Sequence, residues 1–192
     1  MLREVVLLGV LTLGSGVQAQ TTDTMPRDFG CLAQSELRND MHPSEMARIV
    51  RACGQAARFE DAVQVYYTYS SYGLFDQQRV RDESAHVVLG ELAQWMFAFL
   101  DRPTLSGMRA AIDKMRDPQH PFFRQTCDAI HELGPPSYRP EYMIRYGLVP
   151  RKSADDWQTF GFDADAAWHK AVVEINGCPA VEPTSDPAPN SD

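Results

Sequence analysis

Once its first twenty residues are set aside, the sequence lacks any apolar run long enough to cross a membrane. A transmembrane helix needs roughly 20 consecutive apolar residues, whereas the run from Val5 to Leu13 is far shorter and no later segment reaches that length. Basic residues are also scarce, since 18 lysines and arginines stand against 26 aspartates and glutamates, a formal net charge of −8. Because nucleic acids and anionic membrane surfaces need a basic face, we expect neither as a partner. A basic protein partner remains open.

Catalytic and metal-binding motifs are missing as well. The cysteines form no Cys-x-x-Cys pair and no closely spaced set with histidines of the kind that a zinc or redox site requires. No serine beyond residue 19 lies in a Gly-x-Ser-x-Gly turn, and no glycine-rich phosphate loop is present. After His131 and Glu132 the chain reads Gly134-Pro135-Pro136, where a zinc-protease helix would place its second histidine. We therefore predict no catalytic residue, no metal site and no cofactor.

One histidine and carboxylate pair keeps an enzyme as the least favoured alternative. Glu83 and His86 stand three residues apart, which is half of the ligand set of di-iron helical bundles. The required second copy is absent, so we interpret them as a surface pair. An enzyme would need His86 or His131 in a cleft beside a carboxylate with a perturbed pKa.

The chain begins with the layout of a secretory signal. A charged start at Met1 and Arg3 precedes the apolar run, and Val17-Gln18-Ala19 follows it as a cleavage site. We predict a signal peptide over 1–19, a flexible stretch over 20–27, one domain over 28–179 and a disordered proline-rich tail over 180–192. The expected location is the periplasm of a Gram-negative bacterium, with no membrane insertion after cleavage.

Four cysteines in an oxidising compartment predict two disulfides with three possible pairings. Cys31 and Cys53 lie equally far from a turn at His42, so a helical hairpin would bring them together. That leaves Cys127 to pair with Cys178, joining the C-terminal end of the chain to the body. The sequence therefore favours the pairs Cys31–Cys53 and Cys127–Cys178.

Apolar residues recur with helical spacing along the whole chain, and no segment alternates with period two. This pattern predicts an all-α, disulfide-stapled single domain of six to eight helices packed as hairpins. The expected helices cover 32–38, a segment from Pro43, 59–73, 77–100, 105–115, a segment from Pro121, 140–146 and a C-terminal segment that Asp163 caps. Gly73 is expected to end the third helix, and 77–100 is expected to be the central helix.

Two groups of residues are candidates for contact with a protein partner. Aromatic side chains at an interface supply large contact area at low entropic cost, and acidic residues beside them suit a basic partner. The first group is aromatic and consists of Tyr67, Tyr72, Phe75 and Tyr138. The second surrounds one tryptophan with acids and consists of Asp155, Asp156, Trp157, Asp163 and Asp165.

Two resemblances bear on function. Residues 46–66, with Met46 and Ile49 before Ala57-Arg58-Phe59-Glu60-Asp61-Ala62 and Tyr66, resemble part of a tetratricopeptide hairpin. No second copy follows at the family's period of about 34 residues, so this resemblance implies a helical hairpin and a protein-binding groove. The segments 79–86 and 134–138 resemble small exported helical proteins of Gram-negative bacteria.

Small size, export, acidity and disulfides favour a protein that binds other proteins. The leading hypothesis is an immunity-type inhibitor that occludes a basic secreted toxin or hydrolase. A helical scaffold or assembly factor of the cell envelope is the alternative.

Overall fold

The computed structural model describes residues 29–98, 100–150, 153 and 156–181. Over these residues the chain contains seven α-helices, two 3-10 turns and one π-helical turn, with one isolated β-bridge between Val80 and Gln158 and no strand. The all-α class is therefore confirmed. The predicted signal peptide, the stretch 20–27 and most of the predicted tail lie outside the described residues. The elements are η1 (Gln34–Glu36), α1 (Pro43–Gln55), α2 (Phe59–Arg79), η2 (Glu83–His86), α3 (Val87–Phe97), α4 (Arg102–Met115), α5 (Pro121–Leu133), α6 (Glu141–Ile144), α7 (Ala164–His169) and the π-helical turn η3 (Lys170–Ile175).

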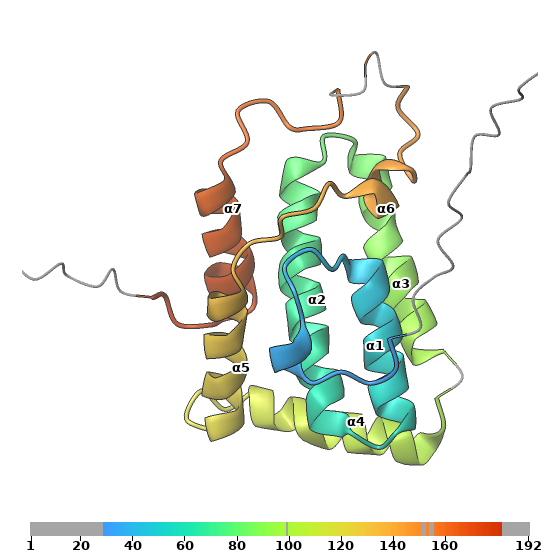
Figure 1. Ribbon diagram of the computed structural model, residues 1–192, viewed down its shortest axis with the longest axis vertical. Coiled ribbons are helices and arrows are strands. Elements are labelled where there is room, and N and C mark those ends of the chain that lie inside the picture. The colour runs from blue at the N-terminus through green and yellow to red at the C-terminus, as the bar shows by residue number, and fades with distance from the viewer. Residues whose placement is uncertain (1–28, 99, 151–152, 154–155, 182–192) are drawn as a thin grey trace, which may run out of the picture.

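Helix α2 is the centre of the bundle. Helices α1 and α3 lie on one side of it, and α5 with the stacked α7 and η3 lies on the other, while α4 crosses one end (Figure 1). The opposite end is covered by η2, α6 and the segment that leads to α7 (Figure 1). We call this second end the apex. Segments from three regions of the sequence meet there.

The prediction of the central helix was wrong. Gly73 does not end a helix, because α2 runs unbroken from Phe59 to Arg79. Gly73 is buried, and a Cβ placed on it would overlap the side chain of Leu89 on α3. The glycine therefore serves close packing of two helices. The predicted helix 77–100 is instead divided by a turn, after which the Asp82 side chain accepts a hydrogen bond from the N–H of Ser84 and caps η2.

Local signals placed several other boundaries well. Pro43 and Pro121 begin α1 and α5, and Asp163 caps α7 by accepting from the N–H of Ala166 at 3.0 Å. The predicted helix over 32–38 is reduced to the single turn η1. Helix α4 begins earlier than expected because Asp101 accepts from the N–H of Thr104 and caps it.

Both predicted disulfides are confirmed. Cys31 pairs with Cys53 in α1, and Cys127 in α5 pairs with Cys178, with Cα separations of 4.4 and 5.4 Å. The second bond joins the chain beyond η3 to the bundle. Since disulfides persist where the surroundings are oxidising, the two bonds indicate an oxidising, exported environment. None of the helices in the described part of the chain is long and apolar enough to cross a bilayer.

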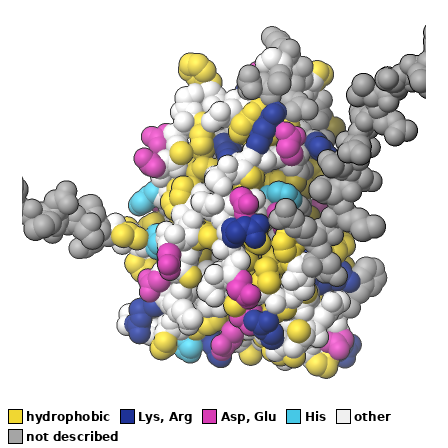
Figure 2. All heavy atoms as spheres, viewed as in Figure 1, with side chains coloured by type: hydrophobic (Ala, Val, Ile, Leu, Met, Phe, Trp, Pro, Cys, Tyr) yellow, Lys and Arg dark blue, Asp and Glu magenta, His cyan; other side chains and the backbone are white. Residues whose placement is uncertain are grey.

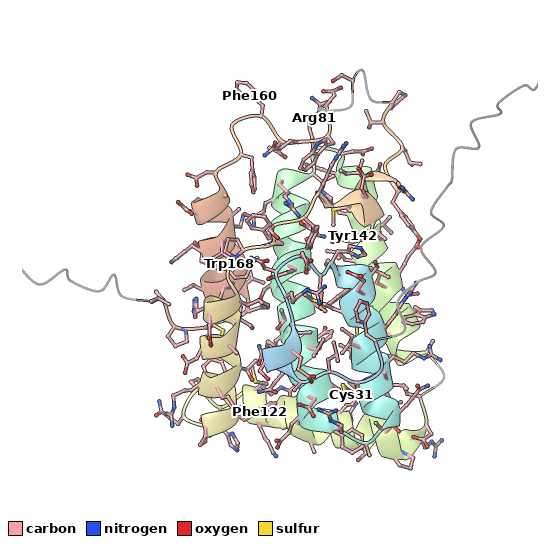
Figure 3. All side chains as sticks on the ribbon, viewed as in Figure 1. Cys31, Arg81, Phe122, Tyr142, Phe160 and Trp168 are labelled. Carbon is pink, nitrogen blue, oxygen red and sulfur yellow. A yellow bond between two sulfur atoms is a disulfide. The ribbon has the colours of Figure 1, made fainter. Side chains whose placement is uncertain are left out.

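The apolar core lies around α2 and joins its two sides. Met46, Ile49 and Val50 of α1 pack toward α2 on one side, and Phe122 and Ile130 of α5 do so on the other. Trp168 of α7 completes the second side. Its ring lies edge-on to those of Tyr72 at 5.8 Å and Phe75 at 6.1 Å, and Figure 3 shows it between α7 and α2.

Two helical glycines give a matched test of this packing. A Cβ on Gly107 of α4 would overlap the ring of Phe59, whereas one on Gly90 of α3 would meet no atom within 4 Å. We expect Gly107→Ala to lower the free energy of unfolding by about 1–3 kcal/mol through overpacking. Gly90→Ala should raise it by about 0.5–1 kcal/mol because alanine favours the helix. Urea unfolding of both variants measures the difference, and equal effects would contradict the close contact of α2 and α4.

Candidate functional site

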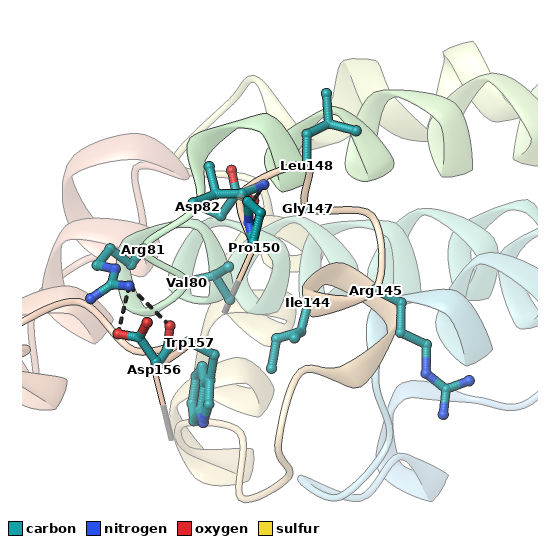
Figure 4. Close-up of a pocket in the computed structure, with 11 residues that line it drawn as sticks. Val80, Arg81, Asp82, Ile144, Arg145, Gly147, Leu148, Pro150, Asp156 and Trp157 are labelled. Carbon is teal, nitrogen blue, oxygen red and sulfur yellow. Dashed lines mark hydrogen bonds and ion pairs between the residues drawn. The ribbon is translucent and has the colours of Figure 1, made fainter. Parts of the chain in front are cut away.

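The apex contains a hollow of about 410 Å³. Its walls come from the end of α2, from α6 with the loop after it, and from the segment that approaches α7. Figure 4 shows Val80, Ile144 and Trp157 among the residues that line it, and these three side chains belong to one apolar cluster. We call it the apical hollow, and its lining residues are Val80, Arg81, Asp82, Ile144, Arg145, Gly147, Leu148, Val149, Pro150, Asp156 and Trp157.

Asp82 and Ser84 hold one wall of the hollow. The Asp82 carboxylate accepts from the Ser84 hydroxyl at 2.6 Å and from the N–H of Val149 at 2.8 Å. The Ser84 hydroxyl oxygen in turn accepts from the N–H of Leu148 at 2.9 Å. The hydrogen bond from Ser84, followed by the one from Val149, lowers the pKa of the Asp82 carboxyl. The turn between α2 and η2 therefore fixes the loop that follows α6.

A short pairing of two extended segments holds the opposite wall. The N–H of Arg81 donates to the carbonyl of Trp157, and the N–H of Thr159 donates to the carbonyl of Arg79, both at 2.9 Å. The Arg81 guanidinium lies 2.6 Å from the carboxylate of Asp156 and also donates to its carbonyl oxygen (Figure 4). Charges at this wall are thus paired, and the Trp157 ring presents the apolar surface.

A buried carboxylate lies beneath the hollow. Asp76 of α2 is fully buried, and its Oδ1 accepts from Nε of Arg79 at 2.7 Å. Its Oδ2 accepts from the hydroxyls of Tyr138 at 2.8 Å and Tyr142 at 2.7 Å. The Arg79 guanidinium also stacks on the rings of Phe75 and Tyr138. Asp76 therefore ties α6, which carries Tyr142, to the central helix.

Burial raises the pKa of the Asp76 carboxyl, while Arg79 and the two tyrosine hydroxyls act in the opposite direction. The same burial, together with the neighbouring carboxylate, raises the pKa of Tyr138 and of Tyr142 well above the ordinary tyrosine value. These hydroxyls stay protonated in the folded chain at a pH where an unfolded chain would already release its tyrosine protons.

This difference predicts loss of stability in alkali. Below about pH 10 both states keep the tyrosine protons, so the pKa shifts have no effect there. Above it the unfolded state releases them first, and each such tyrosine lowers the free energy of unfolding by about 1.4 kcal/mol per pH unit. Between pH 9 and 11 the free energy of unfolding measured in urea should therefore fall by about 1.4 kcal/mol less in Tyr142→Phe than in the wild type. An equal fall in the two proteins would contradict the buried position of that hydroxyl.

The structure corrects two of the predicted contact residues. Tyr72 is 0% and Phe75 is 3% exposed, so neither can touch a partner. Both point from α2 toward Trp168, and the Tyr72 hydroxyl donates to the carbonyl of Gly134. Tyr138 is partly buried, with its hydroxyl turned inward to Asp76. These three side chains contribute to the interior.

The remaining predicted contact residues are dispersed. Tyr67 is half-buried, and its carbonyl faces the side chain of Asn176, on the flank of the bundle formed by α2 and η3. Trp157 and Asp156 both line the apical hollow. Asp163 is occupied in capping α7, and Asp165 is exposed in the first turn of that helix.

The acidic rim expected around Trp157 is not assembled by the acids that can be placed. Asp156 is paired with Arg81, and Asp163 is used as a cap. Asp155 lies outside the described residues. Figure 2 shows acidic and basic side chains interspersed over the face in view. Attraction of a basic partner by this chain would therefore come from its overall charge.

The apex also exposes apolar side chains that the sequence analysis did not single out. Leu148 is 82%, Val149 57% and Phe160 100% exposed, and Figure 3 shows Phe160 extending from the loop away from the helices. The run Gly147-Leu148-Val149-Pro150, apolar and directly after a helix, was the available signal for the first two. Phe160 lies between Trp157 and Phe162 in the chain, and no local pattern distinguishes the aromatic residue that is exposed from the two that are partly buried.

The residues considered for an enzyme are engaged in structural hydrogen bonds. His86 Nε2 lies 2.9 Å from the carbonyl of Val80, and His131 Nε2 lies 2.9 Å from the carbonyl of Pro179. Among the residues that the structure describes, no three side chains of His, Cys, Asp or Glu gather as a metal site would require.

Comparison of the chain with protein-family models, with curated proteins and with solved structures finds no match.

Proposed function

We propose that this chain binds another protein through the apical hollow, and that it acts as an immunity-type inhibitor that occludes a secreted toxin or hydrolase. The observation that carries the proposal is the combination of an apolar hollow with exposed apolar side chains beside it. The exposed Leu148 and Val149 line the hollow together with Val80 and Trp157, and the fully exposed Phe160 follows Trp157 by three residues. Exposed apolar groups that adjoin one another favour association, because contact removes their surface from water.

The dimensions of the hollow suit an anchor residue. Interfaces derive most of their affinity from a few large side chains that enter desolvated pockets. A volume of about 410 Å³ accommodates one or two apolar side chains of a partner. Arg81 and Asp156 at one wall already pair with each other, and the Asp82 carboxylate accepts hydrogen bonds from Ser84 and Val149. An apolar anchor would therefore leave neither carboxylate without a partner.

The hollow is also held in place before any partner arrives. Asp82 and Ser84 fix the loop that carries Leu148 and Val149, and Asp76 fixes α6. A preformed surface avoids the entropic cost of ordering loops on binding. Such rigidity suits an inhibitor that binds as a rigid body and covers the active surface of its target.

Compartment and charge support a secreted, basic target. The signal-like start of the sequence and the two disulfides agree with a periplasmic location. A formal net charge of −8 would accelerate encounter with a basic protein. In this account electrostatics governs the rate of encounter and the apolar apex governs the lifetime of the complex.

The test begins with the mature chain from Gln20, disulfides formed, as bait for proteins of the producing cell and its close competitors. Mass spectrometry should identify one secreted protein at near-stoichiometric yield. Its activity, measured alone and with increasing amounts of the chain, should fall to zero at about one equivalent. Recovery of envelope-assembly components without inhibition of any activity would instead support the scaffold alternative. Retention of full activity in the complex would contradict inhibition.

A further inference from the structure

The pairing at the apex leaves one backbone edge open. In an antiparallel pair, residues directly opposite each other alternate between exchanging both hydrogen bonds and exchanging none. Val80 and Gln158 form a pair that exchanges none, since the bonds run from Arg81 to Trp157 and from Thr159 to Arg79. The backbone N–H and carbonyl of each opposed residue therefore point away from the partner segment.

Val80 and Gln158 differ in the hydrogen bonds that their outward-pointing backbone groups form. The N–H of Val80 donates to the carbonyl of Asp76, and its carbonyl accepts from His86. The N–H and carbonyl of Gln158 bond to no group of the described chain, and Gln158 is exposed. Gln158 therefore presents one free backbone donor and one free backbone acceptor, spaced as in a β-strand, to a segment that could lie beside it.

This edge lies within the apolar surface of the apex. Trp157, one residue before Gln158, lines the apical hollow, and Phe160, two residues after it, is fully exposed. A segment running beside 157–159 would meet Trp157 at one end and, at the other, the turn that begins at Thr159, in which Phe160 is exposed. Side chains of an added strand alternate between faces, so its apolar residues could pack on these rings.

We propose that the partner binds by adding an extended segment to this edge. Its carbonyl accepts from the N–H of Gln158 and its N–H donates to the Gln158 carbonyl, while apolar side chains pack on Trp157 and Phe160. A helical segment cannot form these bonds, because its backbone groups bond within the helix. This inference rests on the proposed function, since it specifies how a protein partner engages the apical hollow.

The edge can be tested without knowing the natural partner. The probe is a displayed library of linear peptides of about 12 residues, long enough to add a strand, selected on the full mature chain. A selected peptide is then synthesised, and its affinity is measured by calorimetry for the wild type and three variants. Gln158→Pro removes the free N–H, Gln158→Ala keeps it as the matched control, and Leu148→Asp tests the apolar apex.

We expect Gln158→Pro to weaken peptide binding about tenfold and Gln158→Ala to leave it nearly unchanged. The N–H of Gln158 takes no part in the fold, and circular dichroism with melting confirms that the proline variant stays folded. A second test changes the peptide and not the protein, because N-methylation removes a backbone N–H. Methylating every second amide should abolish binding when those amides face Gln158, and methylating the other amides should leave binding unchanged.

Three results separate the possibilities. Sensitivity to both Gln158→Pro and alternate N-methylation supports strand addition. Peptides that lose binding with Leu148→Asp but tolerate Gln158→Pro and every N-methylation overturn strand addition and leave the proposed function standing. If no selected peptide loses affinity when Leu148 is replaced by aspartate, the result counts against both strand addition and the proposed function.

Discussion

Replacing Asp76 with leucine is expected to lower the free energy of unfolding by about 3–5 kcal/mol, the largest effect that we predict for a single substitution. Asp76 is fully buried and accepts hydrogen bonds from Arg79, Tyr138 and Tyr142. The variant would leave the guanidinium of Arg79, which is 7% exposed, without a carboxylate. An unpaired buried charge is far more costly than the pair it came from. Urea unfolding at neutral pH with both disulfides intact measures the loss.

A double variant separates the charge effect from loss of packing. Asp76→Leu combined with Arg79→Met removes both charges and keeps apolar volume, so it should recover the part of the loss that comes from the unpaired charge. The hydroxyls of Tyr138 and Tyr142 still lose their acceptor in the double variant, so the rest of the loss should remain. Tyr142→Phe removes one donor only and should cost about 1–2 kcal/mol. A loss below about 1 kcal/mol for Asp76→Leu would mean that the carboxylate is not enclosed as described.

Replacing Leu148 with aspartate is expected to weaken binding of the partner by about 100-fold or more, equivalent to about 2.7 kcal/mol. Leu148 is 82% exposed at the apex, so the variant should fold as the wild type does. The new carboxylate would have to give up water on contact with an apolar anchor. The affinity is measured by calorimetry with the protein recovered by the bait experiment.

Leu105→Asp is the matched control. Leu105 is an exposed leucine, 41% accessible, on α4, which crosses the end of the bundle opposite the apex. The same change of side chain there should alter affinity by less than about threefold. Equal weakening by the two variants would indicate a general effect of charge, and a larger effect at Leu105 would place the interface on α4.

Cysteine spacing and capping residues made much of the fold predictable. Cys31 and Cys53 flank a turn, which left Cys127 and Cys178 as the second pair, and both bonds form. Pro43 and Pro121 suit the first turn of a helix whatever surrounds them. The prolines act within a few residues of their positions, and four cysteines allow only three pairings, so the sequence was sufficient to predict both features.

The central helix could not be located in the same way. A glycine in a helical pattern indicates either the end of a helix or a close approach of two helices. At Gly73 the second applies, because Leu89 of α3 occupies the space of a side chain. That choice depends on a contact between segments 16 residues apart, which no local pattern contains. The misplaced break also led to the wrong boundaries for the next helix.

The candidate site was only partly predictable. Trp157 and Asp156 were selected for their composition and do line the apical hollow. Tyr72 and Phe75 were selected for the same reason and are buried. Helical spacing indicates which residues share a face, but not which face another helix covers. The hollow itself forms where residues 80–82, 144–150 and 156–157 meet, and such a meeting has no sequence motif.

The buried network and the proposed site are connected through α6. Tyr142 binds Asp76, and Ile144, two residues later on the same helix, lines the apical hollow. Variants of Asp76 that remain folded should therefore also weaken partner binding. Under the proposed function, stability and partner binding would depend on one set of hydrogen bonds.

The most direct test of a binding surface at the apex is hydrogen exchange of the mature chain with and without the recovered partner, read by mass spectrometry. The account predicts that protection on binding concentrates in 144–150 and 156–160, with little change in α4 or α5. Protection over α4 and α5 with an unchanged apex would contradict the account, because the partner would then bind a surface away from the apical hollow.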